Sequence, residues 1–512
     1  MNKATLNRQL DVLFVEPDSS VKAYQSLSKT YSAIETPTWS LLLAQSCRAK
    51  GFGVAILDCN AERLTDEQAV KRIREANPRL VCFVLYGQNP NSGTTNMIGG
   101  TRLCAALKDA YPEYTTCFAG PHVSALPKEV LAHSFIDIVL LNEGVYALRD
   151  LLNSDLKDDL SKIKGIGYKK DNNIILNAPR DVVPDDKMDD DLPGYAWDLL
   201  PYDKKPLDLY RSHFWHAGYN HELRTPFAAI YTSLGCPFKC DFCMINIINR
   251  VDNHDGVTAA QSSRIRYWSP EFILREMDKL AYMGVQTIRI SDEMFFLNPK
   301  HFEPLLTGLI QRDYDLRLWS YARLDTITPQ YLDMFREAGM KWLAIGFETA
   351  NWLVRQEVSK GKYDEIDIRQ IAKEVDTHGI NVAANYIFGL PEDNPETMQQ
   401  TLDLACELNT PFANFYPCIA LPGTPLYEQA KKNSWKLPDS YEGYAFFSYE
   451  CQPLPTKYLS AEAVLKFRDD AWHTYHTRRE YLELIERKFG TQQRKNIEDM
   501  TKVKIRRKIL GD

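Results

Sequence analysis

The sequence of 512 residues contains no run of about 18 uninterrupted apolar residues, the length that a membrane-spanning helix requires. It also lacks an excess of basic residues, because 61 Lys and Arg stand against 68 Asp and Glu, for a formal charge of −7. Proteins whose main partner is nucleic acid usually carry a basic face, so this balance argues against such a partner. The first residues lack the apolar segment of a secretory signal, and we therefore expect a cytoplasmic protein.

Neither a disulfide framework nor a dinucleotide site is expected. The chain has eleven cysteines, but in a cytosolic protein thiols serve as core residues, metal ligands or catalysts rather than as disulfides. No G-x-G-x2-G motif follows the first predicted strand. What remains is an ordinary globular composition, 44% apolar and 25% charged. The length is that of roughly two to four domains.

Residues 1–150 alternate short apolar runs with segments of helical periodicity. Such alternation predicts βαβ units and a doubly wound, flavodoxin-like parallel sheet. A ligand of such a sheet binds beyond the carboxyl ends of the strands, where this sequence is rich in glycine and small polar residues. The predicted strands are 11–16, 53–58, 80–86, 115–119 and 136–141, and the predicted helices lie near 38–50, 65–76, 97–110 and 145–153.

Residues 151–224 lose the alternation and carry acids and prolines at short intervals, which predicts an inter-domain linker. It ends in an aromatic, histidine-rich segment, 213–221, for which packing on the next domain is favoured over a ligand contact. Alternation resumes over 225–430, where six βα units are too few for a closed eight-fold barrel and predict a partial (β/α)6 barrel, open on one side. Its predicted strands are 227–234, 285–291, 316–321, 342–347, 381–388 and 412–419.

Residues 431–512 form a predicted helical region on the substrate side of the barrel. Apolar side chains recur there at a helical period between Val464 and Tyr475. The tail from Lys502 to Lys508 is basic, and we expect it to be solvated, with contact to an acidic partner or a membrane surface as the alternative.

A C-x3-C-x2-C triplet, Cys236, Cys240 and Cys243, follows the first predicted barrel strand. Sulfur ligands select iron–sulfur clusters, zinc or copper, and three thiolates on one loop can converge on one metal centre. In a cubane of four irons, three ligands leave the fourth iron free to bind a substrate or cofactor. Structural zinc with His254 as fourth ligand is the alternative, but the second ligand pair of a zinc finger is missing. Active sites of barrels form on this carboxyl-end face.

This triplet, placed in a partial barrel behind a doubly wound domain, resembles that of the cobalamin-binding radical S-adenosylmethionine (SAM) enzymes. The resemblance covers residues 10–430. Further segments similar to that family are 119–127 and 142–144 in the first domain, 192–201 in the linker, and 389–392 and 422–425 in the barrel.

The resemblance implies that the three cysteines hold a [4Fe–4S] cluster whose open iron chelates SAM. An electron from the cluster then cleaves SAM to a 5′-deoxyadenosyl radical. The ammonium group of SAM needs carboxylates, its carboxylate needs cations, and its adenine needs an apolar pocket. Residues that follow the predicted strands can supply these groups. For each of these residues, an ordinary salt bridge or βα turn is the alternative. The implied SAM-binding residues are Asp292, Glu293, Arg323, Glu348, Gly389 and Pro391.

The resemblance also implies that the first domain binds cobalamin. Many cobalamin proteins ligate cobalt through D-x-H-x2-G, whereas Asp58 is followed here by Cys59 and Asn60, so we expect no histidine from that motif on the cobalt. The family often has Gly-Glu-Gly after the fifth strand, and here the segment reads Asn142-Glu143-Gly144. The implied cobalamin contacts are Gln88 and Asn89 near the lower face, with Ser92, Gly120, Pro121, His122, Glu143 and Gly144.

The function that this resemblance implies is a cobalamin-dependent methyltransferase that acts on an unactivated carbon of a small-molecule, sugar or lipid substrate. Such an enzyme needs an external electron donor of the flavodoxin or ferredoxin type. A cobalamin radical SAM enzyme that cyclises or rearranges its substrate without methylation is the first alternative. A non-catalytic cobalamin or iron–sulfur sensor is the second.

Overall fold

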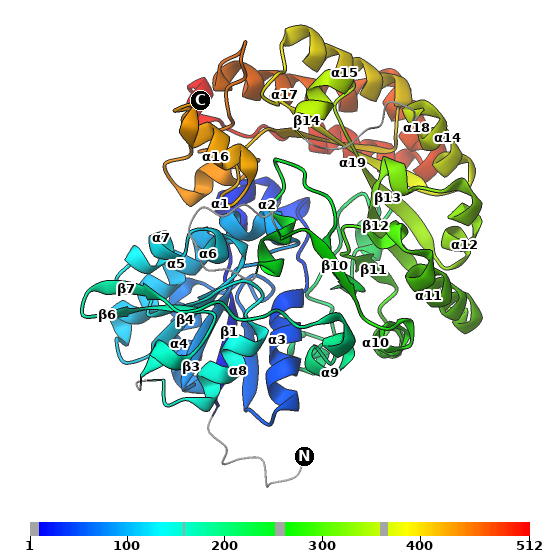
Figure 1. Cartoon of the computed structure of the whole chain (residues 1–512). Coiled ribbons are helices and arrows are strands. Elements are labelled where there is room, and N and C mark those ends of the chain that lie inside the picture. Colours follow the sequence, from blue (N-terminus) through cyan, green and yellow to red (C-terminus); the bar gives the residue numbers. More distant parts are fainter. Residues whose placement is uncertain (1–9, 157–158, 251–261, 359–366) are drawn as a thin grey trace.

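The computed structural model describes residues 10–156, 159–250, 262–358 and 367–512. The chain forms two large sheets with helices around them and a helical C-terminal region (Figure 1). The N-terminal sheet lies at one end of the molecule, and the C-terminal helices lie across the other end. This arrangement is the α/β architecture that the alternation of strands and helices predicts.

The N-terminal sheet has the strand order β2-β1-β3-β4-β5-β6-β7. Its first five strands are parallel, and their 2-1-3-4-5 order is that of flavodoxin-like folds, which confirms the doubly wound sheet. The strands are β1 (Val12–Glu16), β2 (Val54–Asp58), β3 (Leu80–Val84), β4 (Thr115–Ala119), β5 (Ile138–Leu140), β6 (Ile166–Lys170) and β7 (Asn173–Leu176). The helices are α1 (Ser20–Tyr24), α2 (Leu27–Thr30), α3 (Thr38–Ala49), α4 (Asp66–Ala76), α5 (Gly93–Ala110), α6 (Pro121–Ala125), α7 (Pro127–Ala132) and α8 (Val145–Asn153).

This sheet extends past the boundary expected at residue 150. Strands β6 and β7 add an antiparallel hairpin to β5, so the segment expected as linker over 151–224 begins with sheet structure. The hairpin lies at the sheet edge, and β7 is exposed at Asn173 and only partly buried elsewhere. The apolar run of β7, Ile174 to Leu176, has only three residues, which is shorter than the runs of about four to eight by which buried strands are recognised in a sequence.

The second sheet is a parallel sheet in the order β15-β14-β13-β12-β11-β8, with the first and last of these at its two edges. An open sheet of this order is the predicted partial barrel. Its strands are β8 (Phe227–Ile230), β11 (Thr287–Ile290), β12 (Arg317–Arg323), β13 (Met340–Glu348), β14 (Asn381–Phe388) and β15 (Phe412–Pro417). The helices are α10 (Pro270–Tyr282), α11 (Pro299–Arg312), α12 (Leu332–Glu337), α13 (Trp352–Glu357), α14 (Ile368–Thr377), α15 (Pro395–Leu408) and α16 (Pro425–Lys432).

The first predicted barrel strand, 227–234, is divided between two sheets. Strand β8 belongs to the barrel, whereas β9 (Ser233–Cys236) pairs antiparallel with β10 (Arg264–Tyr267). The chain turns between them because the Asp292 carboxylate, after β11, accepts hydrogen bonds from the Thr232 hydroxyl at 2.6 Å and the Ser233 hydroxyl at 2.5 Å. The first cysteine of the triplet therefore ends a hairpin strand and not the barrel strand itself.

The histidine-rich segment 213–221 packs against the amino-terminal end of the barrel strands. The Trp215 ring lies 4.9 Å from that of Trp319 and 5.1 Å from that of Trp342. His216 is buried and donates a hydrogen bond to the Arg317 carbonyl at 3.1 Å. Burial lowers the pKa of His216 well below its ordinary value, so the ring is neutral. The expected packing on the barrel is confirmed.

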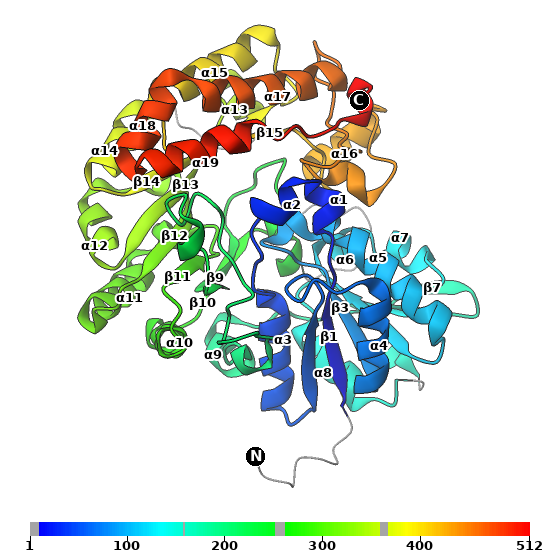
Figure 2. The same ribbon diagram turned by 180° about the vertical axis from the view of Figure 1, so that it is seen from behind.

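The C-terminal region covers the barrel with three helices that lie along its outer side (Figure 2). Helix α17 packs on β15 and donates the Arg468 guanidinium to the Phe415 carbonyl at 2.6 Å. The three helices are α17 (Ala461–Thr477), α18 (Arg479–Phe489) and α19 (Thr491–Thr501), and α9 (Met188–Asp191) lies in the linker.

The expectation of a solvated basic tail is wrong for Arg507, whereas the other basic residues of the tail, Lys502, Lys504, Arg506 and Lys508, are exposed. Arg507 is buried and pairs with Asp469 at 2.9 Å. The Arg506 amide donates to the Gln25 side chain at 3.1 Å, and Gln25 donates to the Arg506 carbonyl at 3.0 Å. The tail thus runs from the C-terminal helices to helix α1 of the first domain. Its charge pattern alone could not show this, because the acidic partner of Arg507 lies 38 residues away in the sequence.

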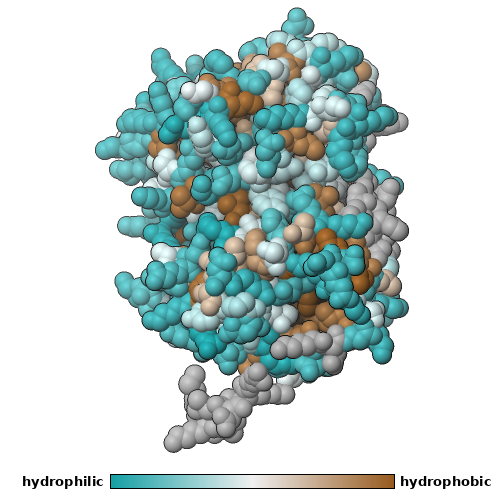
Figure 3. Space-filling model, turned by 90° about the vertical axis from the view of Figure 1, so that its left-hand side faces the viewer, coloured by the Kyte–Doolittle hydropathy of each residue, from teal (hydrophilic) through white to brown (hydrophobic). Residues whose placement is uncertain are grey.

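No helix of the described ranges is long and apolar enough to cross a membrane. On the face of the molecule in Figure 3, hydrophilic side chains predominate and hydrophobic ones are interspersed among them.

Candidate active site between the two sheets

A cavity of about 900 Å³ lies where the carboxyl ends of both sheets meet the C-terminal region. Its first wall comes from the loops after β1, β2 and β3 of the N-terminal domain, and its second from the cysteine loop and the barrel strands. Residues 444–447, α17 and the tail after α19 form the third wall. Ligands of both kinds of sheet bind at carboxyl ends of strands, so the two domains place their binding edges around one space.

All three cysteines of the triplet line this cavity. Cys236 is buried, and Cys240 and Cys243 are half-buried. The loop is held by its own backbone and by Asn246, whose side-chain oxygen accepts a hydrogen bond from the Cys236 amide at 3.0 Å. The Cys243 amide donates to the Cys240 carbonyl at 3.2 Å. The triplet therefore presents its thiols to the cavity from a fixed loop.

Gly235 fixes where the cysteine loop begins. Its φ is +94°, and a Cβ at this position would lie 2.2 Å from Nδ2 of Asn249 and 2.3 Å from the carbonyl oxygen of Arg264. Only glycine fits this close approach of hairpin strand and side chain. The residue before Cys236 thus sets the direction in which that cysteine enters the cavity.

Asn91 links the N-terminal domain directly to the cysteine loop. Its Nδ2 lies 3.6 Å from Sγ of Cys243, and its Oδ1 accepts a hydrogen bond from the Met244 amide at 2.9 Å. The sequence reasoning missed this residue, although it stands two positions after Asn89 in the same polar loop. The two domains are therefore in direct contact at the cysteine triplet.

Within the described ranges, no three His, Cys, Asp or Glu side chains are gathered as ligands of a single metal ion. His254, the ligand of the zinc alternative, lies outside the described residues. A cubane cluster separates its thiolate ligands by its own width, so the thiols of the triplet need not converge on one point.

Three of the six expected SAM-binding residues line the cavity beside the triplet: Glu293, Arg323 and Glu348. The Arg323 guanidinium lies 3.7 Å from Sγ of Cys240, stacks 3.7 Å over the Phe238 ring and pairs with a neighbouring aspartate at 2.9 Å. Glu348 has a φ of +62° at an irregularity of the β13–β14 pairing. Backbone in this region is costly for a non-glycine residue and concentrates at functional sites.

The other three, Asp292, Gly389 and Pro391, lie outside the cavity wall. Asp292 is buried against Thr232 and Ser233, and burial raises its pKa to about 6. Gly389 has a φ of +83°, and a Cβ there would lie 2.3 Å from Cγ1 of Val464 on α17. These contacts hold the loops that carry the lining residues, and the placement does not favour direct contact with SAM.

The wall that the N-terminal domain supplies is made largely of amides and hydroxyls. Three expected cobalamin contacts, Gln88, Asn89 and Ser92, belong to it. The corrin ring of cobalamin is edged with carboxamides, which neutral donors and acceptors of this kind satisfy without a charge. The wall comprises Ser19, Ser20, Asn60, Gln88, Asn89, Asn91, Ser92, Thr95 and Asn96.

The remaining expected cobalamin contacts, Gly120, Pro121, His122, Glu143 and Gly144, do not line the cavity. Glu143 pairs with Arg266 at 2.8 Å, and both side chains are only 3% exposed. His122 is buried between Thr94 at 3.1 Å and a glutamate at 3.3 Å. The Glu143–Arg266 pair holds the first domain against the hairpin that carries Cys236, whereas the contacts of His122 lie within the first domain.

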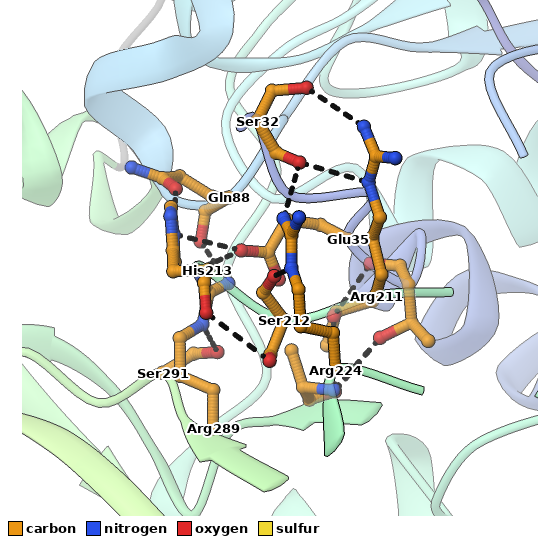
Figure 4. A network of polar contacts seen from close by, with 12 residues as sticks. Ser32, Glu35, Gln88, Arg211, Ser212, His213, Arg224, Arg289 and Ser291 are labelled. Atoms are coloured by element: carbon orange, nitrogen blue, oxygen red, sulfur yellow. Dashed lines mark hydrogen bonds and ion pairs between the residues drawn. The ribbon is translucent and has the colours of Figure 1, made fainter. Parts of the chain in front are cut away.

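A network of polar contacts joins four segments beside the cavity (Figure 4). Arg289 of β11 pairs with Glu35 at 2.9 Å and donates to the Gln88 carbonyl at 2.7 Å. His213 of the linker lies 3.1 Å from Oε1 of Gln88 and 3.3 Å from Oε1 of Glu35. Burial opposes ionisation of Glu35, but Arg289 and His213 together hold its pKa below the ordinary value. The network therefore fixes the Gln88 loop to the barrel.

Two carboxyl groups stand side by side at the carboxyl ends of β1 and β2. Glu16 and Asp58 are partners in the strand register, and Glu16 also lines the cavity. Asp58 is buried, accepts hydrogen bonds from the Tyr210 hydroxyl at 2.8 Å and the Ala61 amide at 2.9 Å, and has its pKa raised by burial to about 7. Burial and Asp58 raise the pKa of Glu16 as well.

We expect this raised pKa to make stability depend on pH. Between about pH 4 and pH 7 the unfolded chain ionises Asp58 while the folded chain keeps it protonated, so stability falls as the pH rises. Relative to Asp58→Asn, the wild-type free energy of unfolding should drop by up to about 4 kcal/mol over this range. Urea unfolding of both proteins at pH 4, 5.5 and 7 measures the difference. Parallel pH curves would show that Asp58 ionises normally in the folded protein.

Comparisons with known proteins agree with this two-domain site. Residues 27–152 match the B12 binding domain and residues 230–405 match the radical SAM superfamily. An uncharacterized methyltransferase of Pyrococcus horikoshii is 25% identical over 447 residues, which are 86% of this chain and 88% of that protein. The anaerobic magnesium-protoporphyrin IX monomethyl ester cyclase of Rubrivivax gelatinosus is 24% identical over 86% of this chain and 72% of its own length.

Among solved structures, the radical SAM methyltransferase TsrM of Kitasatospora setae, with tryptophan and a SAM analogue bound, has the same fold. Its TM-score is 0.65 at 18% identity, over 96% of this chain and 99% of that chain. The two matched domains here share one cavity, with the cysteine triplet on one wall and neutral amides on the other. Domains of these kinds use a [4Fe–4S] cluster with SAM and cobalamin, respectively. The chain belongs to the cobalamin-binding radical SAM enzymes.

Proposed function

We propose that the protein is a cobalamin-dependent radical SAM methyltransferase that acts on an unactivated carbon of a small molecule. The observation that carries this proposal is the shared cavity, which the cysteine triplet and the amide wall of the first domain line from different sides. A methyl transfer of this type needs both cofactors to face one substrate. In support, the Pyrococcus relative that matches 86% of the chain is named an uncharacterized methyltransferase.

The residues of the two walls have separate tasks in this proposal. Cys236, Cys240 and Cys243 hold the cluster, and Glu293 and Glu348 provide carboxylates for the ammonium group of SAM. Arg323 balances the charge beside Cys240. When bound, the cluster supplies the electron that cleaves SAM, and cobalamin supplies the methyl group. The two domains and the C-terminal region surround the cavity, and this enclosure limits the access of water to a reactive carbon centre.

The stoichiometry of SAM consumption tests the proposal. Anaerobic turnover with a reductant of the flavodoxin type should yield 5′-deoxyadenosine and S-adenosylhomocysteine in equal amounts, together with a product heavier by one methylene unit. Liquid chromatography with mass spectrometry measures all of them in one sample. Methylated product without 5′-deoxyadenosine would contradict the radical route.

The alternative of a non-methylating enzyme is favoured by one observation, the similarity of 86% of the chain to a cyclase. Such an enzyme would form 5′-deoxyadenosine without S-adenosylhomocysteine. A sensor would form neither. The same chromatogram therefore separates the three functions.

A further inference from the structure

Asn91 extends from the first domain to the cysteine loop of the barrel. It lies between Asn89 and helix α5 in the chain, and its side-chain amide contacts Cys243 and Met244. We infer that Asn91 donates a hydrogen bond to the Cys243 thiolate when the cluster is bound and thereby raises the reduction potential of the cluster. The inference rests on the cluster that the proposed function assigns to the triplet. Asn91 is thus a positioning residue, which acts on the cluster through Cys243.

The orientation of the Asn91 amide follows from its contact with the backbone. The Met244 amide can only donate, and it donates to Oδ1 of Asn91 at 2.9 Å. Nδ2 of Asn91 therefore takes the other end of the side-chain amide, where it lies 3.6 Å from Sγ of Cys243. The donor of Asn91 thus faces the sulfur, and the acceptor of the same side chain holds the cysteine loop.

The loop that carries Asn91 is fixed by the protein itself. Pro90 is buried and begins a short turn, Pro90–Ser92, that leads into α5. Arg289 of the barrel donates to the Gln88 carbonyl at 2.7 Å and so holds the preceding part of the loop. A group whose position is locked by packing and hydrogen bonds keeps a functional geometry. The Asn91 donor is therefore preorganised for the sulfur.

A thiolate at Cys243 gains from this donor. Cys243 and Asn91 are both half-buried and line the cavity. A charge that loses water needs donors in its place, and a hydrogen bond to an ionised acceptor is roughly twice as strong as one between neutral groups. Hydrogen bonds to the sulfurs help to set the potential of an iron–sulfur cluster. Because the reduced cluster carries one more electron, the donor stabilises the reduced form more and raises the potential.

The barrel brings a different donor to a different cysteine. Nη1 of Arg323 lies 3.7 Å from Sγ of Cys240, and the same guanidinium pairs with Asp325 at 2.9 Å. The donor at Cys243 is instead uncharged and comes from the first domain. The potential of the cluster therefore depends on the first domain as well as on the barrel.

Asn91→Leu tests the donor, because leucine is close to asparagine in size and has no polar side-chain atom. Electron paramagnetic resonance of the full-length, cluster-loaded protein, poised with redox mediators, gives the ratio of reduced to oxidised cluster at a fixed potential. We expect this ratio to fall at least about threefold relative to the wild type. Asn153→Leu, at the exposed end of α8, is the matched control and should keep the wild-type ratio. A wild-type ratio in Asn91→Leu would overturn the inference.

Asn91→Asp separates the donor from a purely structural role. Aspartate keeps an oxygen for the Met244 amide and lacks the NH2 group that faces Cys243. We expect the ratio of reduced to oxidised cluster to fall at least as far as in Asn91→Leu, because the carboxylate also adds a negative charge. A wild-type ratio in Asn91→Asp would show that Asn91 acts only by holding the loop, and the inference would fail.

A measurement on the wild type needs no variant to hold its cluster. Protein labelled with nitrogen-15 at the side-chain amide of asparagine should show a coupling between an asparagine nitrogen and the reduced cluster in pulsed electron paramagnetic resonance. Asn153→Leu should retain this coupling, and Asn91→Leu should lose it. Absence of the coupling in the wild type, or its persistence in Asn91→Leu, would overturn the inference.

The same preparations separate this inference from the proposed function. If they show the nitrogen coupling and the altered ratio but form no 5′-deoxyadenosine when SAM is added, the role of Asn91 stands and the proposed function is wrong. If they form 5′-deoxyadenosine but lack the coupling, the role of Asn91 is wrong and the proposed function stands.

Discussion

Cys240→Ala is expected to lose the iron–sulfur absorbance and to form no detectable 5′-deoxyadenosine. Cys240 is one of three thiols that line the cavity, and Arg323 lies 3.7 Å from its sulfur. With only two thiolates left, a cubane lacks the ligand set that fixes it on the loop. Visible absorbance after anaerobic reconstitution and chromatography of the reduced reaction mixture measure the two losses.

Cys82→Ala is the matched control for this substitution. Cys82 is fully buried in β3 and packs in the core of the N-terminal sheet. Its replacement removes one buried sulfur and should cost only modest stability, with cluster absorbance and SAM cleavage retained. Retention of both signals in Cys240→Ala, or their loss in both variants, would contradict the assignment of the triplet.

Arg266→Leu is expected to lower the free energy of unfolding by about 3–5 kcal/mol, because it leaves the Glu143 carboxylate buried without its partner. Arg266 pairs with Glu143 at 2.8 Å, and it also donates to Oδ1 of Asn249 at 2.9 Å. Burial already raises the pKa of Glu143. Urea unfolding at pH 7 measures the loss.

Arg369→Leu provides the comparison for Arg266→Leu. Arg369 pairs with Glu407 at 2.6 Å, but the two side chains are 60% and 53% exposed. A surface pair of this kind contributes little to stability, because water screens the two charges. The double variant Glu143→Leu with Arg266→Leu should recover part of the loss, since no charge stays buried. An equal decrease in the free energy of unfolding for Arg266→Leu and Arg369→Leu would show that the buried pair does not stabilise the contact between the first domain and the hairpin.

The fold could be predicted wherever a strand is buried on both faces or a helix has one apolar face. Strands β1 to β5 and the six barrel strands could be predicted because each contains a run of apolar residues. The β6–β7 hairpin was not predicted, because the apolar run of its edge strand has only three residues. The course of the tail could not be predicted either, because Arg507 finds Asp469 only in the folded chain.

The candidate site was predictable from spacing and from position at strand ends, but not from side-chain direction. Spacing identified the three cysteines. Asp292 and Glu293 are neighbours after β11, yet only Glu293 lines the cavity, because the Asp292 carboxylate is turned toward the hydroxyls of Thr232 and Ser233. The Glu35–Arg289 pair joins residues far apart in sequence, although a buried charge inside the apolar strand β11 was a signal for it.

Elemental analysis of the anaerobically reconstituted protein, after removal of unbound cofactors, tests the central claim most directly. Three thiolates that hold a [4Fe–4S] cluster, across one cavity from a cobalamin-binding wall, predict four iron atoms and one cobalt atom per chain. Zinc at the triplet in place of iron, or iron without cobalt, would contradict the account.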